Sequence, residues 1–270
     1  MTVPPRLAAT LLGALLTLSV ISPASGGVRK PPVDGRADYQ LGGAYRPAKG
    51  VGIVLRDHSV QPAKGRYNIC YINAFQTQPG SLRWWKRHRP RLLLRDRRGR
   101  LVRDPGWRAE VLLDTSTNRK RRAITRVQRR WFRGCARNGF DGVEPDNLDS
   151  WTRSRHLLTR RANVRLARRL AHVAHRNGLA IAQKNTPQLT PRQTRRIGFD
   201  FAIAEECEVY RECRRYTRTY HRHVIEIEYT DNGRKAFRRA CRKRGNRMSV
   251  LLRDRNVVKR GNLAYRYRWC

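Results

Sequence analysis

Carboxylates are the residues of this chain whose spacing most directly suggests chemistry. The 270-residue sequence contains 20 Asp and Glu, and 12 of them fall in two short segments. One segment holds Asp141, Glu144, Asp146 and Asp149, and the other runs from Asp200 to Asp231. Carboxylates that converge on one cleft suit glycoside hydrolysis, in which one acid protonates the leaving oxygen and a carboxylate attacks or activates water. Crowded like charges raise the pKa of one such acid, which keeps it protonated near neutral pH.

The same acids could also have a structural or a metal-binding role. A helix cap or an Arg partner accounts equally well for any single Asp or Glu. A divalent metal would also use several carboxylates, but the sequence has no H-E-x-x-H motif and no C-x-x-C pair. The nucleophile elbow, the phosphate loop and the dinucleotide fingerprint are also missing. We therefore expect an enzyme without metal or cofactor.

The overall charge points to a different partner. Lys and Arg number 60 against 20 acids, a formal net charge of +40. Such an excess suggests a polyanion binder, or a solvated coat without a specific partner. At 39% hydrophobic residues the chain is not disordered on composition, and its length allows one large domain.

The amino terminus predicts secretion. Residues 1–26 resemble a signal peptide, with Arg6, an apolar run over 7–20 and a small-residue cleavage site at 24–26. We expect a linker over 27–37, a single domain over 38–270 and no membrane segment after cleavage. Six cysteines then suit three disulfides in an oxidising compartment. Cys207 with Cys213 is the pair best supported by spacing. Cys241 with Cys270 would leave Cys70 and Cys135.

Strand and helix patterns alternate along the chain. Apolar or β-branched runs predict strands over 51–55, 67–74, 110–113, 142–144, 179–183, 201–204, 224–229 and 248–252. Helical spacing predicts helices from Ile124 to Gly139, over 163–177 and over 233–244. Eight strands with helical connections suit a single-domain α/β fold, the (β/α)8 TIM barrel. An open doubly wound sheet is the alternative.

A barrel of this kind would bring the acids together. Functional side chains of such barrels collect at the carboxyl ends of the strands. The residues there include Asp57, Asn73, Asp114, Glu144, Asp146, Asn147, Lys184, Asn185, Glu205, Glu206, Glu228 and Tyr229. We therefore expect the two acid segments to face one mouth. Trp84, Trp85 and Trp107 could stack on sugar rings or pack within the barrel.

The nine residues Gly139 to Asn147 read GFDGVEPDN, which resembles the signature of glycoside hydrolase family 114, the endo-α-1,4-polygalactosaminidase family. Shorter blocks agree in order over about residues 38–253. They are Gln40-Leu41, Cys70-Tyr71-Ile72, Trp107 with Glu110 and Leu113-Asp114, Asn177-Gly178-Leu179, Lys184-Asn185, Phe199-Asp200, Glu205-Glu206-Cys207 with Cys213, and Glu228-Tyr229. The sequence departs from the family pattern near Phe75 and before Leu113.

The resemblance implies a barrel that cleaves polymers rich in α-1,4-galactosamine. It implies Asp146 as nucleophile and Glu205 as general acid/base of a retaining, endo-acting enzyme. The residues expected around the substrate are Asp57, Tyr71, Asp114, Glu144, Asn147, Lys184, Asn185, Glu228 and Tyr229.

Two functional hypotheses follow. The first is a secreted, monomeric glycoside hydrolase whose partner is a polysaccharide, with non-specific polyanion contact through its surface. The alternative is a barrel without catalysis that binds a cell-wall polyanion or nucleic acid through Arg-rich faces.

Overall fold

Nine strands form one sheet whose order follows the sequence from β1 to β9. They are β1 (Arg36–Gln40), β2 (Val51–Asp57), β3 (Tyr67–Asn73), β4 (Gly142–Asp146), β5 (Ala180–Lys184), β6 (Phe201–Glu205), β7 (Val224–Tyr229), β8 (Ser249–Arg253) and β9 (Tyr267–Trp269). The first eight are parallel, and β9 runs antiparallel to β8. Because β1 also contacts β8, the sheet curls into a nearly closed barrel. The predicted single-domain (β/α)8 barrel is confirmed.

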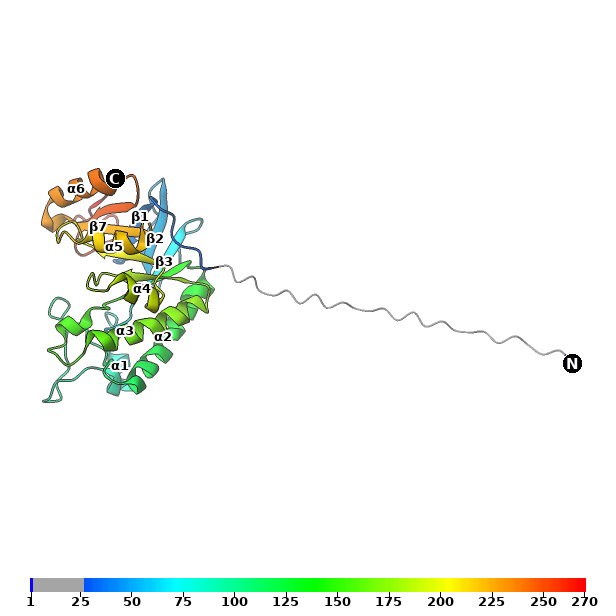
Figure 1. Cartoon of the computed structure of the whole chain (residues 1–270), viewed down its shortest axis with the longest axis vertical. Coiled ribbons are helices and arrows are strands. Elements are labelled where there is room, and N and C mark those ends of the chain that lie inside the picture. The colour runs from blue at the N-terminus through cyan, green and yellow to red at the C-terminus, as the bar shows by residue number, and fades with distance from the viewer. Residues whose placement is uncertain (2–26) are drawn as a thin grey trace.

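The computed structural model describes Met1 and residues 27–270 (Figure 1). The signal peptide expected over 1–26 lies, Met1 apart, outside the described residues. Among those that are described, no helix is long and apolar enough to cross a membrane.

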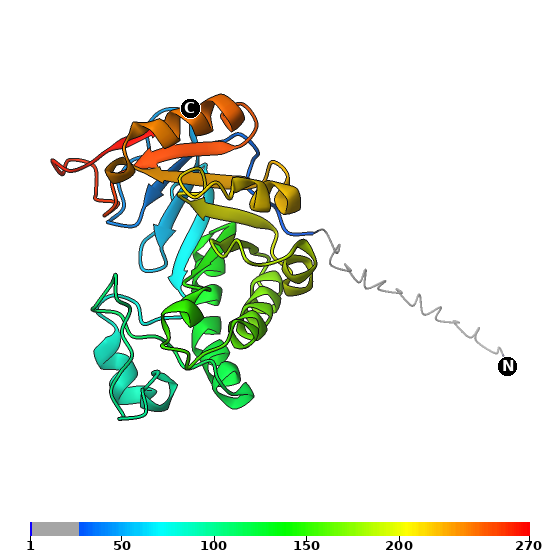
Figure 2. The same ribbon diagram turned by 60° about the vertical axis from the view of Figure 1, so that its left-hand side comes forward.

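The helices, apart from α1 in the segment between β3 and α2, pack on the outside of the curled sheet (Figures 1 and 2). The full set is α1 (Leu82–His88), α2 (Asn118–Asn138), α3 (Arg160–His175), α4 (Pro191–Ile197), α5 (Cys213–Tyr220) and α6 (Arg234–Arg244), with the 3-10 helices η1 (Pro90–Leu92), η2 (Ser150–Arg153) and η3 (Thr230–Asn232). Over residues 36–73, no helix separates β1, β2 and β3. The predicted end of α2 is confirmed at Gly139, whose φ of 89° is the left-handed conformation that glycine tolerates best.

The barrel lacks one strand that was predicted and contains one that was not. Residues 110–113 do not join it, because Val111, Leu112 and Leu113 make isolated antiparallel bridges within an excursion from β3 to α2. In Figure 2 this excursion lies beyond the arrowhead of β3, in teal. The strand that completes the set of eight is instead β1. Its sequence RADYQ has no β-branched residue. Its buried polar side chains are satisfied inside the fold, since Gln40 donates to Asp38 at 2.8 Å and accepts from Arg56 at 2.9 Å.

Alternate residues of the strands fill the barrel interior. A buried cluster combines Tyr39, Ile53, Ile69, Ala182, Ile203, Ile227 and Leu251 from seven of the strands. A second, larger cluster lies between the sheet and the helices. This two-layer packing is the expected solution for strands whose side chains alternate between two faces.

Three disulfides cross-link the described part of the chain. Cys70 in β3 bonds to Cys135 in α2, Cys207 to Cys213, and Cys241 in α6 to Cys270. The predicted pair is confirmed, and so is the suggested assignment of the other four. In the chain-entropy model the 65-residue loop closed by Cys70 and Cys135 is worth about 4 kcal/mol.

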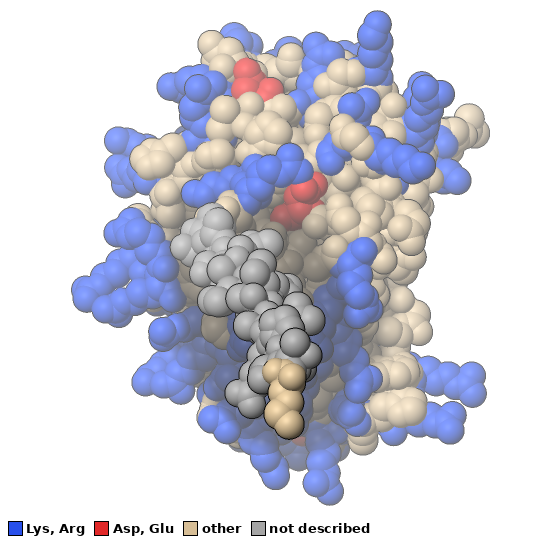
Figure 3. All heavy atoms as spheres, turned by 90° about the vertical axis from the view of Figure 1, so that its right-hand side faces the viewer, with Lys and Arg blue, Asp and Glu red and all other residues tan. Residues whose placement is uncertain are grey.

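Positive charge is spread over the surface. Lys and Arg side chains cover the face seen in Figure 3, and Asp and Glu appear there at few points. The Lys and Arg side chains on this face therefore form a solvated coat.

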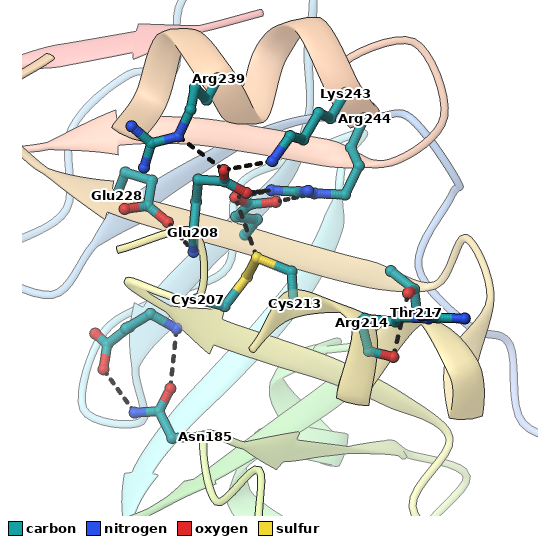
Figure 4. Close-up of a disulfide and its surroundings, with 12 residues drawn as sticks. Asn185, Cys207, Glu208, Cys213, Arg214, Thr217, Glu228, Arg239, Lys243 and Arg244 are labelled. Carbon is teal, nitrogen blue, oxygen red and sulfur yellow. Dashed lines mark hydrogen bonds and ion pairs between the residues drawn. A yellow bond between two sulfur atoms is a disulfide. The ribbon is translucent and has the colours of Figure 1, made fainter. Parts of the chain in front are cut away.

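A partly buried ion-pair cluster fixes α6 to β7 and to the segment after β6 (Figure 4). Glu208 accepts from Arg239, Lys243 and Arg244 at 3.0, 2.9 and 2.6 Å. Arg244 also donates to Glu226, whose side chain is fully buried. Burial alone would raise the pKa of Glu208, but these three cations hold it at about 2.

We expect Arg244→Met to lower the free energy of unfolding by about 3–5 kcal/mol, because Glu226 would stay buried without its cation. The control Arg242→Met alters an exposed neighbour on α6. It should change the free energy of unfolding by less than about 0.5 kcal/mol. Urea unfolding measures both. Equal losses in the two variants would contradict a structural role for the cluster.

Glu228 gives the fold a pH dependence. This buried residue accepts from the Glu208 backbone N–H at 3.0 Å, and burial raises its pKa to about 8. The unfolded chain releases that proton near pH 4.3, so ionisation favours unfolding as the pH rises through this interval. Glu228→Gln stays neutral throughout. We expect the melting temperature of the variant, relative to wild type, to be higher at about pH 8.5 than at about pH 5. A difference independent of pH would show that Glu228 ionises normally.

Candidate active site

The carboxyl ends of the barrel strands surround a cavity of about 790 Å³. Strands β4, β5 and β6 end in Asp146, Lys184 and Glu205, and all three side chains line this cavity. Tyr39, Tyr71 and Tyr229 reach it from β1, β3 and β7. The barrel therefore gathers, at the edge where such folds place their chemistry, residues far apart in the sequence.

The side chain of Lys184 is the centre of the site, with only 2% exposure. Its Nζ lies 2.9 Å from Oε1 of Glu144, 3.4 Å from Oδ1 of Asp146 and 3.3 Å from Oε2 of Glu205. It also donates to the hydroxyl of Tyr39 at 3.1 Å, which in turn donates to Glu144 at 2.7 Å. Burial alone would lower the pKa of Lys184, but the three carboxylates raise it well above its ordinary value.

Burial separates the carboxylates around Lys184 into two kinds. The side chain of Glu144 is fully buried, whereas those of Asp146 and Glu205 are 18% and 21% exposed. Burial raises the pKa of Glu144 to about 7, although Lys184 and Tyr39 bond to it. Asp146 and Glu205 can thus touch a ligand, and Glu144 supports Lys184 from below.

Hydrogen bonds hold both exposed carboxylates in place. Oδ2 of Asp146 accepts from the hydroxyl of Tyr71 at 2.9 Å, and Oδ1 accepts from the backbone N–H of Asn147 at 2.7 Å. Glu205 accepts from Nδ2 of Asn185 at 2.9 Å and from the hydroxyl of Tyr229. Such locked rotamers are what a preorganised site requires.

The chain turns sharply after each of these three strands. Asn147, Asn185 and Glu206 follow the strand ends with φ values of 67°, 48° and 57°. This left-handed conformation is disfavoured for residues other than glycine, with Asn the best tolerated. The turns let neighbouring side chains face back toward the strand ends, and Asn185 uses this position to bond Glu205.

Two arginines frame the cavity. Arg153 contacts Asp104 at 2.6 Å and Asp149 at 2.9 Å, and donates to Oδ1 of Asn147 at 2.8 Å. On the other side, Arg255 donates to Glu206 at 2.6 Å and lies 4.2 Å from the ring centroid of Tyr229. These contacts tie the rim loops to the groups that hold Asp146 and Glu205.

Other lining residues add apolar surface and a titratable group. Trp107 is 54% exposed at the cavity, as stacking on a sugar ring would require. Trp85 is fully buried, and Trp84 does not line the cavity. Glu110 is buried in the lining and accepts from Asn73 at 2.6 Å. Burial raises the pKa of Glu110 to about 7.

The structure brings most of the predicted site residues to the cavity. Lining it are Asp57, Tyr71, Asp146, Asn147, Lys184, Asn185, Glu205 and Tyr229. Three predicted substrate contacts do not line it. Glu144 lies beneath Lys184, Glu228 is buried against Glu208, and Asp114 lies elsewhere in an ion pair with Lys120.

The expectation that both acid segments face the mouth was too broad. Of those 12 carboxylates only Asp146, Asp149, Glu205 and Glu206 line the cavity. Asp141 and Asp200 sit at the opposite strand ends, where they accept from the backbone N–H groups of Asn68 and Ile181 at 2.7 and 2.8 Å. Their role is to join neighbouring strands.

Several lining residues were not predicted from the sequence. Tyr39 was missed because β1 was not predicted, and Asp104 and Arg153 lie in segments without a periodic signal. Arg255 could have been found, since it closely follows a predicted strand, as the other site residues do.

Comparisons with known proteins identify the family and support the fold. The model of glycoside-hydrolase family GH114 matches residues 20–270. The structure of Ega3 from Aspergillus fumigatus in complex with galactosamine superposes with a TM-score of 0.72 at 19% identity, covering 92% of this chain and 100% of that one. The glycoside hydrolase domain of PelA from Pseudomonas aeruginosa gives 0.61 at 15% identity, covering 84% and 97%.

No curated protein matches the sequence. The two structural likenesses support the fold, and the family match extends over nearly the whole described chain. The protein belongs to glycoside-hydrolase family GH114.

Proposed function

We propose that this glycoside hydrolase is secreted and cleaves α-1,4-linked galactosamine polymers internally, with retention of configuration. The observation that carries the proposal is the pair Asp146 and Glu205, two partly exposed carboxylates on one buried ammonium at the mouth of the barrel. The resemblance in the run from Gly139 to Asn147 and the galactosamine complex of Ega3 support the substrate class.

The charge of the cavity suits a cationic polymer. Seven carboxylates line it against three cations, Arg153, Lys184 and Arg255. A cleft of one sign concentrates ligands of the other sign, even inside a protein of opposite net charge, because salt screens charges beyond about 10 Å. A galactosamine chain would therefore be attracted locally despite the +40 coat.

The proposed steps use the two carboxylates in turn. Asp146 attacks the anomeric carbon while Glu205 gives its proton to the leaving oxygen, which forms a glycosyl ester on Asp146. Glu205 then takes a proton from water, and the water oxygen displaces Asp146 from the same face that the leaving group occupied. Tyr71 and Tyr229 orient the two carboxylates through their hydroxyls.

The spacing favours retention. Oδ1 of Asp146 and Oε2 of Glu205 lie 3.4 and 3.3 Å from the same Nζ, so they are at most about 6.7 Å apart, the sum of the two distances. Retaining pairs are about 5–5.5 Å apart, and inverting pairs about 6.5–9.5 Å. The upper bound for these two oxygens lies below most of the inverting range, which supports retention.

We expect Asp146→Asn and Glu205→Gln each to lower kcat on polygalactosamine by about 10²–10⁴-fold or more without loss of folding. The control Glu212→Gln removes a carboxylate that does not line the cavity and should keep wild-type turnover. Product analysis by mass spectrometry should show short oligosaccharides with the wild type. Near-normal turnover in either site variant would refute the catalytic assignment, and binding without any cleavage by wild type would favour the non-catalytic alternative.

The stereochemical outcome is a separate prediction. We expect proton NMR of the first products to show the α-anomer, since two displacements at one carbon restore its configuration. Initial appearance of the β-anomer would identify an inverting enzyme and would remove the nucleophilic role of Asp146.

Secretion is supported by the three disulfides, which persist in oxidising compartments. A cell-fractionation experiment with the full chain tests it, and the expected location is the culture medium. Retention of the full chain in the cytoplasm would contradict this location.

A further inference from the structure

A second hollow adjoins the candidate active site and carries the opposite charge. It has a volume of about 1090 Å³ and is lined by residues of α1, η1 and α2. Asp57, Gln78 and Pro79 line both this hollow and the cavity, so the two adjoin at that edge. We call this second hollow the basic groove.

The charged lining of the basic groove is almost entirely cationic. Seven Arg and Lys side chains line it against one carboxylate, Asp57. Five of the seven come from α2, which carries nine Arg and Lys residues and no Asp or Glu in its 21 residues. The cavity next to it has the reverse balance, with seven carboxylates against three cations.

Few of these charges are neutralised by the protein itself. Lys120 pairs with Asp114, while Asp57 accepts from Ser59 and Gln78. Within residues 27–270, Arg126 and Arg130 form no ion pair; they lie one helical turn apart on α2 and are both exposed. Crowded like charges repel, so an anion bound between them is favoured.

Aromatic rings form part of the groove wall. The imidazole of His58 stacks on Trp131, with ring centroids 5.1 Å apart and an interplanar angle of 20°. Trp84 is 38% exposed, and its ring lies 5.2 Å from that of His88. Rigid ring faces with convergent polar groups are typical of ligand sites.

Positive charge alone does not single out this groove, because Lys and Arg also cover the face in Figure 3. The groove differs from a coat in its volume, its ring faces and its position beside a sugar-cleaving cavity. The position beside that cavity also favours a glycan over a nucleic acid, since one polymer could reach both hollows.

We infer that the basic groove binds acidic groups, such as carboxylates, of the glycan whose amino sugars occupy the cavity. The inference rests on the proposed function and extends it, since the substrate becomes a mixed-charge polymer. Its amino groups lie near the cleaved bond, and its acid groups lie further along the chain, beyond Asp57, Gln78 and Pro79.

The binding test is independent of catalysis. The full chain with Asp146→Asn is titrated against fluorescently labelled oligogalacturonate, which carries carboxylates and no amino groups. Adding Arg126→Gln with Arg130→Gln should raise the Kd roughly tenfold. The matched pair Arg161→Gln with Arg168→Gln removes two exposed charges from α3, away from both hollows, and should change the Kd less than about twofold. Equal changes of the Kd in the two pairs would show that the anion binds to surface charge in general, and would overturn the inference.

A second measurement tests whether groove and cavity share one polymer. Unmodified polygalactosamine is compared with a lightly N-succinylated sample, in which some amines carry a carboxylate. We expect the ratio of kcat/KM for the succinylated polymer over the unmodified one to fall roughly tenfold in the groove pair and to hold within about twofold in the α3 pair. An unchanged ratio in the groove pair would overturn the mixed-charge substrate. Failure of wild type to cut either polymer, with groove binding intact, would instead refute the proposed function.

Nucleic acid is the remaining occupant to test. A labelled single-stranded oligonucleotide with the same number of charges is titrated under the same salt conditions. We expect it to bind more weakly than oligogalacturonate, with little dependence on Arg126 and Arg130. Tighter binding that the groove pair abolishes would identify a nucleic-acid site and overturn the glycan assignment.

Discussion

One buried ammonium group holds the candidate active site together. Moving the ammonium of Lys184 out of water costs several kcal/mol, and the cost is offset only where opposite charges and hydrogen bonds surround it closely. Glu144 and Asp146 supply them from β4, and Glu205 supplies a third carboxylate from β6. Three neighbouring strands must therefore end at one level of the barrel. The position of the two exposed carboxylates is a consequence of that constraint.

The location of the charged residues in this protein is more informative than their total. The total of +40 describes the coat, but the cavity collects seven carboxylates and the groove beside it seven cations. Several carboxylates outside the cavity have structural roles. Asp141 and Asp200 join strands at the far end of the barrel, and Glu208 and Glu226 anchor α6 through Arg244. A single net charge therefore says little about the ligand of either hollow.

Much of the fold and of the site could be predicted from the sequence. Apolar runs located seven of the eight barrel strands, and the rule that chemistry lies past strand ends brought Asp146, Lys184 and Glu205 together. Prediction failed for β1, where Asp38 and Gln40 are buried polar residues that satisfy each other and leave no apolar pattern. Residues 110–113 were wrongly placed in the barrel, because a short apolar run does not reveal its strand partner. Burial of Glu144 and Glu228 depends on tertiary contacts that no local pattern encodes.

We propose above all that Asp146 becomes covalently bonded to the sugar. The most direct test treats the Glu205→Gln variant with an activated aryl α-galactosaminide, whose good leaving group needs no acid, and maps the quenched protein by mass spectrometry. The glycosyl ester should accumulate, because the amide that replaces the Glu205 carboxylate cannot activate the water that would remove it. We predict a galactosamine adduct on the peptide that contains Asp146. An adduct on another peptide, or turnover of the aryl glycoside with no adduct, would contradict the account.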